Sequence, residues 1–179
     1  MKKEFKNLKK SCNNFITQKT IEAPVVQAVT SDKNQAKLSI LDVPDVPGIA
    51  AKIFTALSEK NINVDMIVQS AAREGYNDIS FTLSRTDLKE SLNVLENVSK
   101  ELKASGVIYD NKIAKVSIVG VGMKSYPGVA AKMFTILAKN KINIEMISTS
   151  EIKISCIIKE KELKKAVKAL SKNFKLTKD

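Results

Sequence analysis

Two polar turns, each ending in Pro-Gly, carry the residues best suited to chemistry. They span residues 42–48 and 122–128, and each leads into a run of helix-forming residues. The start of a helix presents unpaired backbone N–H groups, which favour a carboxylate or a phosphate. Asp45, with Asp65 or Glu145 from the strand after the helix, would offer acceptors to an ammonium group. The turns therefore predict a site for a free amino acid. The alternative is that Pro-Gly only begins a helix and that both acids face water.

Catalytic chemistry finds little support in the other residues. The sequence holds no histidine, the commonest general base and metal ligand near neutral pH. It has neither zinc-ligand spacing nor a phosphate loop of the Walker type. Gly120 and Gly122 follow a strand but lack the third glycine of a dinucleotide turn, so we interpret them as a tight turn. Asp42 and Asp45 could form an acid–base pair, but Asp45 is better explained as a helix-start or ligand-contacting residue. We do not expect this chain alone to be an enzyme.

A repeated segment must position the two turns. Residues 47–70 and 127–150 align without a gap at an offset of 80 residues, and they share 13 of 24 positions. In each copy apolar residues recur at helical spacing after Pro-Gly, and a β-rich run follows. Two diverged copies of one unit predict two similar small domains.

The flanks of the repeat complete each unit. Residues 36–41 and 114–119 alternate apolar and polar side chains ahead of each copy, as half-buried strands do. Another strand and a second amphipathic helix follow each copy, and residues 107–109 could form a closing strand. This order is the ferredoxin-like βαββαβ pattern. We expect an α+β fold of two tandem ferredoxin-like units, each with an antiparallel four-stranded sheet and both helices on one face.

The segments expected along the chain follow from these patterns. They are a basic leader, disordered or a remnant, at 1–22; a short strand ending in a turn at Ser31–Asn34, within 23–34; a first unit at 35–111; and a second unit at 112–179, with Asn111 and Lys112 as the linker.

The net charge of +11 suggests nucleic-acid or membrane binding, but its distribution does not. Residues 1–20 and 161–179 contribute +5 each, so the body between them is nearly neutral. Arginine occurs twice and tryptophan never, whereas nucleic-acid surfaces combine clustered basic residues with stacking aromatics. Two cysteines make no disulfide framework, and no apolar run reaches membrane-spanning length. We therefore expect a cytoplasmic protein that binds neither nucleic acid nor membrane.

Several motifs strongly resemble the regulatory half of aspartokinase. They are the doubled Pro-Gly-x-Ala-Ala-Lys, NINVDMIVQ at 61–69, AKVSIVGVGMKSYPGVAAKMF at 114–134 and INIEMISTSEIKIS at 142–155. That half is a tandem pair of ACT domains, which are ferredoxin-like modules that bind amino acids, and the resemblance covers about residues 23–176. It implies that the strand at Val25–Thr30 completes the second unit's sheet. The kinase half should lie upstream, so the resemblance implies a free-standing regulatory (β) subunit or the tail of a longer enzyme.

The resemblance also implies an effector site in the turns and in the strands after the helices. The residues carried over from the first unit are Asp45, Pro47, Gly48, Ile49, Ala50, Asn63, Val64, Asp65 and Gln69. Those from the second unit are Met123, Ser125, Tyr126, Gly128, Val129, Ala130, Asn143, Ile144, Glu145, Thr149, Ser150 and Glu151.

The function implied is feedback inhibition of aspartokinase by lysine, threonine or both, without a cofactor or a metal. The implied partners are a second copy of the chain, which completes the effector site, and the catalytic subunit of aspartokinase. The alternative is a stand-alone ACT module that binds ligands or assembles another enzyme or regulator.

Overall fold

The computed structural model describes residues 25–121 and 126–176. Their secondary structure follows the expected order twice. The first half holds β1 (Ala28–Pro44), α2 (Ile49–Ser58), β2 (Val64–Gln69), β3 (Tyr76–Leu83), η1 (Arg85–Asp87) and α3 (Leu88–Leu102). The second half holds β4 (Gly106–Val119), α4 (Val129–Lys139), β5 (Met146–Thr149), β6 (Lys153–Lys159), η3 (Glu160–Glu162) and α5 (Leu163–Asn173).

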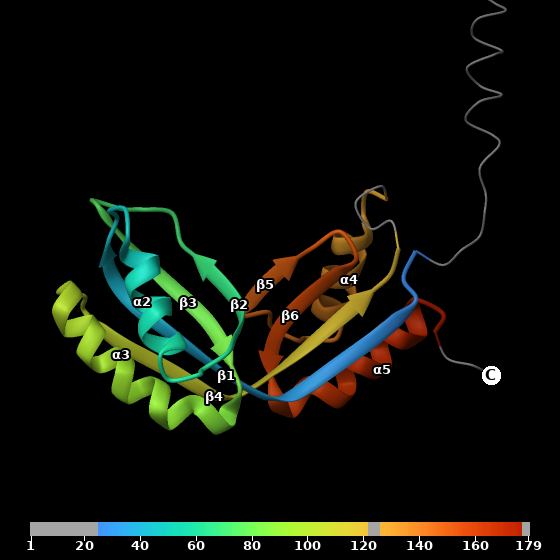
Figure 1. Ribbon diagram of the computed structural model, residues 1–179. Helices are drawn as coiled ribbons and strands as arrows, with labels where there is room; N and C mark the ends of the chain where they lie inside the picture. Colours follow the sequence, from blue (N-terminus) through green and yellow to red (C-terminus); the bar gives the residue numbers. More distant parts are fainter. Residues whose placement is uncertain (1–24, 122–125, 177–179) are drawn as a thin grey trace, which may run out of the picture.

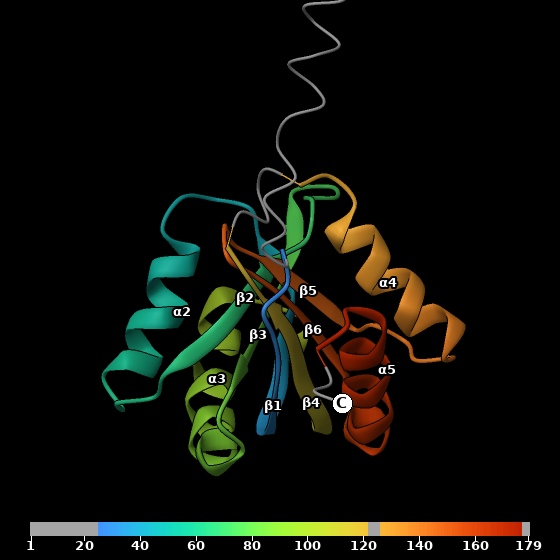
Figure 2. The same ribbon diagram turned by 90° about the vertical axis from the view of Figure 1, so that its right-hand side faces the viewer.

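All six strands belong to one antiparallel sheet, in the order β2-β3-β1-β4-β6-β5. Helices α2 and α3 cover the first half of this sheet, and α4 and α5 cover the second half (Figure 1). Seen from the side, the strands lie in the middle with one helix pair on each flank (Figure 2). The sheet curves strongly enough for its two end strands, β2 and β5, to touch at the centre of the molecule. The α+β fold of two ferredoxin-like units is confirmed.

Strands β1 and β4 belong to both units. The second half of β1 pairs with β3, from Ala36 opposite Leu83 onward, while its first half pairs with the end of β4, from Ala28 opposite Val119. The start of β4 in turn closes the first unit, where Gly106 lies opposite Leu41. The closing strand at residues 107–109 is confirmed. The first strand completes the second unit's sheet as expected, but it begins at Ala28 and not at Val25.

The expected turn at residues 31–34 and the expected linker at Asn111 and Lys112 were wrong, because both lie inside continuous strands. The β1–β4 register shifts here instead, between Asp32 and Lys37. At each shift an aspartate accepts a hydrogen bond from the backbone N–H two residues later: Asp32 from Asn34 at 2.8 Å, and Asp110 from Lys112 at 2.7 Å. A hydrogen bond from an aspartate to the N–H two residues later is also typical of turns. Here the backbone stays extended despite these bonds.

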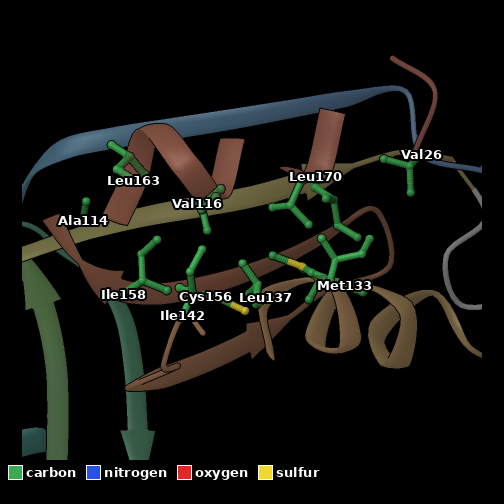
Figure 3. Close-up of a cluster of buried hydrophobic side chains, with 14 residues drawn as sticks. Val26, Ala114, Val116, Met133, Leu137, Ile142, Cys156, Ile158, Leu163 and Leu170 are labelled. Atoms are coloured by element: carbon green, nitrogen blue, oxygen red, sulfur yellow. The ribbon is translucent and has the colours of Figure 1, made fainter. Parts of the chain in front are cut away.

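Each unit has its own core between helices and sheet. In the first, Leu38, Leu57 and Phe81 are fully buried, and the rings of Phe54 and Phe81 meet edge to face at 5.4 Å. Figure 3 shows the second core, where α4 and α5 pack against β4 and β6. A third cluster, of Met66, Ile113, Met146 and Ile157, lies between the units.

Candidate functional site

The turn before α4 borders a hollow of about 450 Å³. One wall is the start of the helix, with Gly128 in the left-handed region at φ 96°. The other is the end of β5 and the residues after it. The predicted site residues that line it are Tyr126, Gly128, Val129, Ala130, Thr149, Ser150 and Glu151. The first N–H groups of an α-helix have no partner within it, so this hollow offers donors at one wall and side-chain hydroxyls at the other.

The corresponding turn in the first unit is braced from the β2–β3 connection. The Asp45 backbone N–H donates to the Gly75 carbonyl at 2.8 Å, and the Asn77 amide donates to the Asp45 carboxylate at 3.0 Å. Gly48 repeats the left-handed conformation at φ 95° and begins α2 ahead of Ile49. Thus Asp45, Pro47, Gly48, Ile49 and Ala50 lie at the start of α2, and residues 47–50 take the same place there as residues 127–130 at the start of α4. Gln69 ends β2, as Thr149 ends β5.

The other predicted residues lie elsewhere. Val64 and Asp65 begin β2 directly after Asn63, and Asn143, Ile144 and Glu145 precede β5. Both groups lie at the end of their unit away from its turn. The physical reason is that each helix carries the chain back along the sheet, so the next strand begins at the opposite end. Within one chain, therefore, Asp65 and Glu145 do not join Asp45 around a single ligand. Met123 and Ser125 lie outside the described residues.

Asp65 and Glu145 instead join the two units through lysines. The Lys37 and Lys159 ammonium groups each lie 2.7 Å from the Glu145 carboxylate, and Lys115 pairs with Asp65. Lys37 and Lys115 occupy the same place in the repeated Ala-Lys-x-Ser-Ile of β1 and β4, so the pairs are related by the internal repeat. The sequence carried a signal for these pairs that was missed: each copy of the repeat holds one lysine, Lys37 or Lys115, and one acid, Asp65 or Glu145.

Burial and the lysine contacts shift the pKa of Glu145 in opposite directions. Its side chain is 12% exposed, and this burial disfavours the charged form. Hydrogen bonds from Lys159 and Lys37 outweigh that effect and hold the pKa of Glu145 below its ordinary value. Asp110 behaves alike, because its bonds from Lys159 and from the Lys112 backbone outweigh burial and lower its pKa. Both carboxylates are therefore charged and already partnered near neutral pH.

Cys156 lies in β6 with its thiol fully buried. Burial raises the pKa of this thiol to about 12, which leaves it unreactive near neutral pH. The described residues hold no cluster of three or more potential metal ligands. None of their helices is long and apolar enough to cross a membrane.

Comparison with known proteins places the chain among regulatory regions. The ACT-domain family matches residues 41–98 and 116–174. The aspartate kinase of Pseudomonas putida is 50% identical over 159 residues, which cover 89% of this chain and 39% of that protein. The chain thus spans about two fifths of the length of the curated relatives it matches.

Two solved structures are similar to this chain over more than four fifths of its length. The regulatory subunit of aspartate kinase from Thermus thermophilus superposes with a TM-score of 0.79 at 42% identity, over 83% of this chain and 97% of that one. A chain from a structure of aspartokinase alpha and beta subunits superposes with a TM-score of 0.79 at 45% identity, over 84% of this chain and 99% of that one.

Proposed function

The chain belongs to the ACT-domain family and corresponds to the regulatory region of aspartate kinase, and from this premise we propose that it is a non-catalytic sensor of a free amino acid. The sensor belongs to an aspartate kinase, as a separate subunit or as part of a longer chain. The observation that carries this proposal is the hollow between Tyr126 and Ala130 on one side and Thr149 and Glu151 on the other. Its volume of about 450 Å³ lies in the range of small-ligand sites.

The ligand chemistry follows from the two walls of the hollow. The N–H groups at the start of α4 suit the carboxylate of an amino acid. The hydroxyls of Thr149 and Ser150 offer acceptors to its ammonium group. The effector that we propose is lysine, threonine or both, on the resemblance to aspartokinase, with no cofactor. The first-unit turn, from Asp45 to Ala50 with Gln69, is the candidate for a second site.

Self-association is part of the proposal. The end strands β2 and β5 leave one edge each without a partner in the sheet order. Such edges readily pair with another chain, and Ile67 and Ile147 are 52% and 42% exposed on them. A second copy is how residues 63–65 and 143–145 could reach a turn that they do not approach within one chain.

The proposed regulation is allosteric and acts on a catalytic subunit or domain in the cytoplasm. Effector binding favours one arrangement of the paired chains, and that arrangement lowers the activity of the kinase. A coupling of about 1–3 kcal/mol between the two sites is typical of such systems. An effector that binds this chain and leaves the cognate kinase activity unchanged would refute the regulatory part of the proposal.

The direct test is thermal unfolding of the chain against a panel of free amino acids. A ligand at 100 times its dissociation constant stabilises the folded state by about 2.7 kcal/mol, and for a chain of this size the midpoint rises by roughly 5–11 °C. We expect such a rise with lysine or threonine and none with glycine or glutamate. If no amino acid shifts the midpoint, the sensing role is wrong.

A matched pair of variants localises the site. Thr149→Val removes one hydroxyl from the hollow at nearly constant shape, and we expect it to weaken effector binding by about 2–12-fold, the effect of one hydrogen bond. Thr55→Val makes the same change on an exposed face of α2 and should leave affinity unchanged. Equal affinities for the two variants would place the effector elsewhere.

The alternative function is a stand-alone ACT module that serves another enzyme or regulator. Co-purification separates the two functions, because a kinase subunit should accompany a true regulatory chain. Nucleic-acid binding through the basic ends remains the third possibility, and it predicts a steep loss of affinity with salt.

A further inference from the structure

A groove of about 690 Å³ lies where β1 and β4 pass between the units, next to η3 and the start of α5. Lysines line it from four elements: Lys33 in β1, Lys112 in β4, Lys161 in η3 and Lys164 in α5, with Lys159 at the end of β6. We name it the lysine groove. It shares no residue with the hollow at the start of α4.

The carboxylates of the lysine groove are already engaged. Asp110 accepts hydrogen bonds from Lys159 at 2.5 Å and from the Lys112 backbone at 2.7 Å. Glu160 pairs with Arg85 at 3.0 Å. Within the described part of the chain, the side chains of Lys33, Lys112, Lys161 and Lys164 form no ion pair. Among residues 25–121 and 126–176, these four ammonium groups therefore border one concave surface without an ion-pair partner, beside two carboxylates, Asp110 and Glu160, that are paired with other side chains.

The internal repeat shows that this charge is specific to one unit. The related hollow of the first unit is lined by Asp32, Asn34 and Ser84. In the lysine groove the related positions hold Asp110, Lys112 and Lys159. The aspartate is retained, while both neutral side chains are replaced by lysine. The two hollows thus differ in charge at two of these three related positions, and the one lysine that lines the first-unit hollow, Lys115, is paired with Asp65.

We propose that the lysine groove binds a small molecule that carries a chain of two or more phosphate groups. Four unpaired ammonium groups match several negative charges, whereas a single carboxylate would neutralise one of them. Hydrogen bonds from an ammonium group to a charged phosphate oxygen are stronger than hydrogen bonds between neutral groups. The groove is concave and of small-ligand size. No aromatic side chain lines it, which disfavours single-stranded nucleic acid, since that usually stacks on aromatic rings. This site goes beyond the amino-acid sensor proposed above.

The test uses the full chain at about 0.15 M salt, where attraction between exposed charges is largely screened beyond roughly 8 Å. Tripolyphosphate is titrated calorimetrically, and we expect saturable binding of one molecule per chain. Sulfate should bind far more weakly. An ATP titration distinguishes the sources of the phosphate chain: tighter binding than tripolyphosphate indicates a nucleotide, and equal binding a bare phosphate chain.

Two double variants with equal charge changes decide the location. Lys112→Asn with Lys161→Gln removes two charges from the lysine groove, and Lys103→Asn with Lys100→Gln removes two from the end of α3. We expect the groove variant to lose at least about 10-fold in tripolyphosphate affinity, and the α3 variant to stay within about twofold. Both variants should keep the wild-type response to amino acids, because the effector hollow is separate.

Three results would overturn the proposal. They are no saturable binding by the wild type, unchanged affinity in the groove variant, and equal losses in both variants, which would indicate non-specific attraction to a basic protein. None of them bears on the amino-acid response, so the two proposals can fail separately.

Discussion

Three glycines, Gly48, Gly120 and Gly128, are needed at their positions for different physical reasons. Gly48 and Gly128 adopt φ near +95°, a conformation that other residues enter at a cost. Gly120 instead allows a close approach, because a Cβ there would collide with the Val25 carbonyl. The sequence suggested only a tight turn at Gly120, since nothing in its local pattern reveals that residue 25 crosses above it.

Replacing Gly120 tests this close approach. In Gly120→Ala the added methyl must displace the backbone at Val25 and Val26, and Val26 is buried in the second core. We expect a loss of about 1–3 kcal/mol in unfolding free energy, as for other overpacked sites. Urea unfolding measures it, and Ala28→Gly serves as a control for backbone freedom. A change below about 0.5 kcal/mol would contradict the contact.

At the scale of elements, the residue patterns predicted the helices and the order of the strands, while only the family resemblance indicated that the first strand serves the second unit. The alternation in residues 36–41 and 114–119 is the same whether a strand pairs within its unit or across to the other one. The strands' extra length was hidden by Asp32 and Asp110, whose local bonds imitate turns. The two turns of the site were identified correctly as helix starts. Asp65 and Glu145 were assigned to the same site as these turns, because the sequence does not reveal which end of the following strand lies next to a turn.

The ion pairs between units should contribute to stability. Glu145→Gln leaves Lys37, whose side chain is 22% exposed, without its carboxylate, while Lys159 keeps Asp110. A mostly buried polar group that loses its partner costs about 1–3 kcal/mol. For a chain of this length the unfolding midpoint should fall by roughly 2–12 °C. Glu96→Gln, at an exposed position on α3, is the matched control. Equal midpoints for both variants would mean that the pairs contribute nothing.

The same carboxylate predicts a dependence on pH. The pKa of Glu145 is lowered in the folded state from an ordinary value of 4.5, so the unfolded chain binds its proton first. Its stabilising effect is thus fully present above pH 4.5 and is lost as the pH falls through the lower, folded pKa. Wild-type stability should therefore decline on acidification below that value more steeply than that of Glu145→Gln. Parallel pH profiles would contradict this assignment.

For the molecule as a whole, the shared strands join two repeat units into one body. Neither four-stranded half of the sheet is complete without a strand segment from the other unit. The third cluster, which includes Met66 and Met146, and the ion pairs of Lys37 and Lys115 also connect the two units. Two small domains joined by a linker would unfold separately, whereas this arrangement should unfold as one cooperative system.

Two repeat-related core residues test that cooperativity. Leu57 and Leu137 are fully buried in the first and second cores. Leu57→Ala and Leu137→Ala should each cost about 2–5 kcal/mol and lower one common transition, with calorimetric and van't Hoff enthalpies in agreement. A variant that melts in two separate steps would show that the units are independent.

The pairing of Ala28 with Val119 has a consequence for how the chain is made. The first half of β1 leaves the ribosome well before its partner in β4 exists, and at about 5–20 residues per second the delay is on the order of 5–20 s. During that interval the edge of β1 has unpaired backbone N–H and C=O groups. Such an edge can pair incorrectly with other chains. The first half of β1 is therefore open to mispairing until residues 113–119 of β4 have been made.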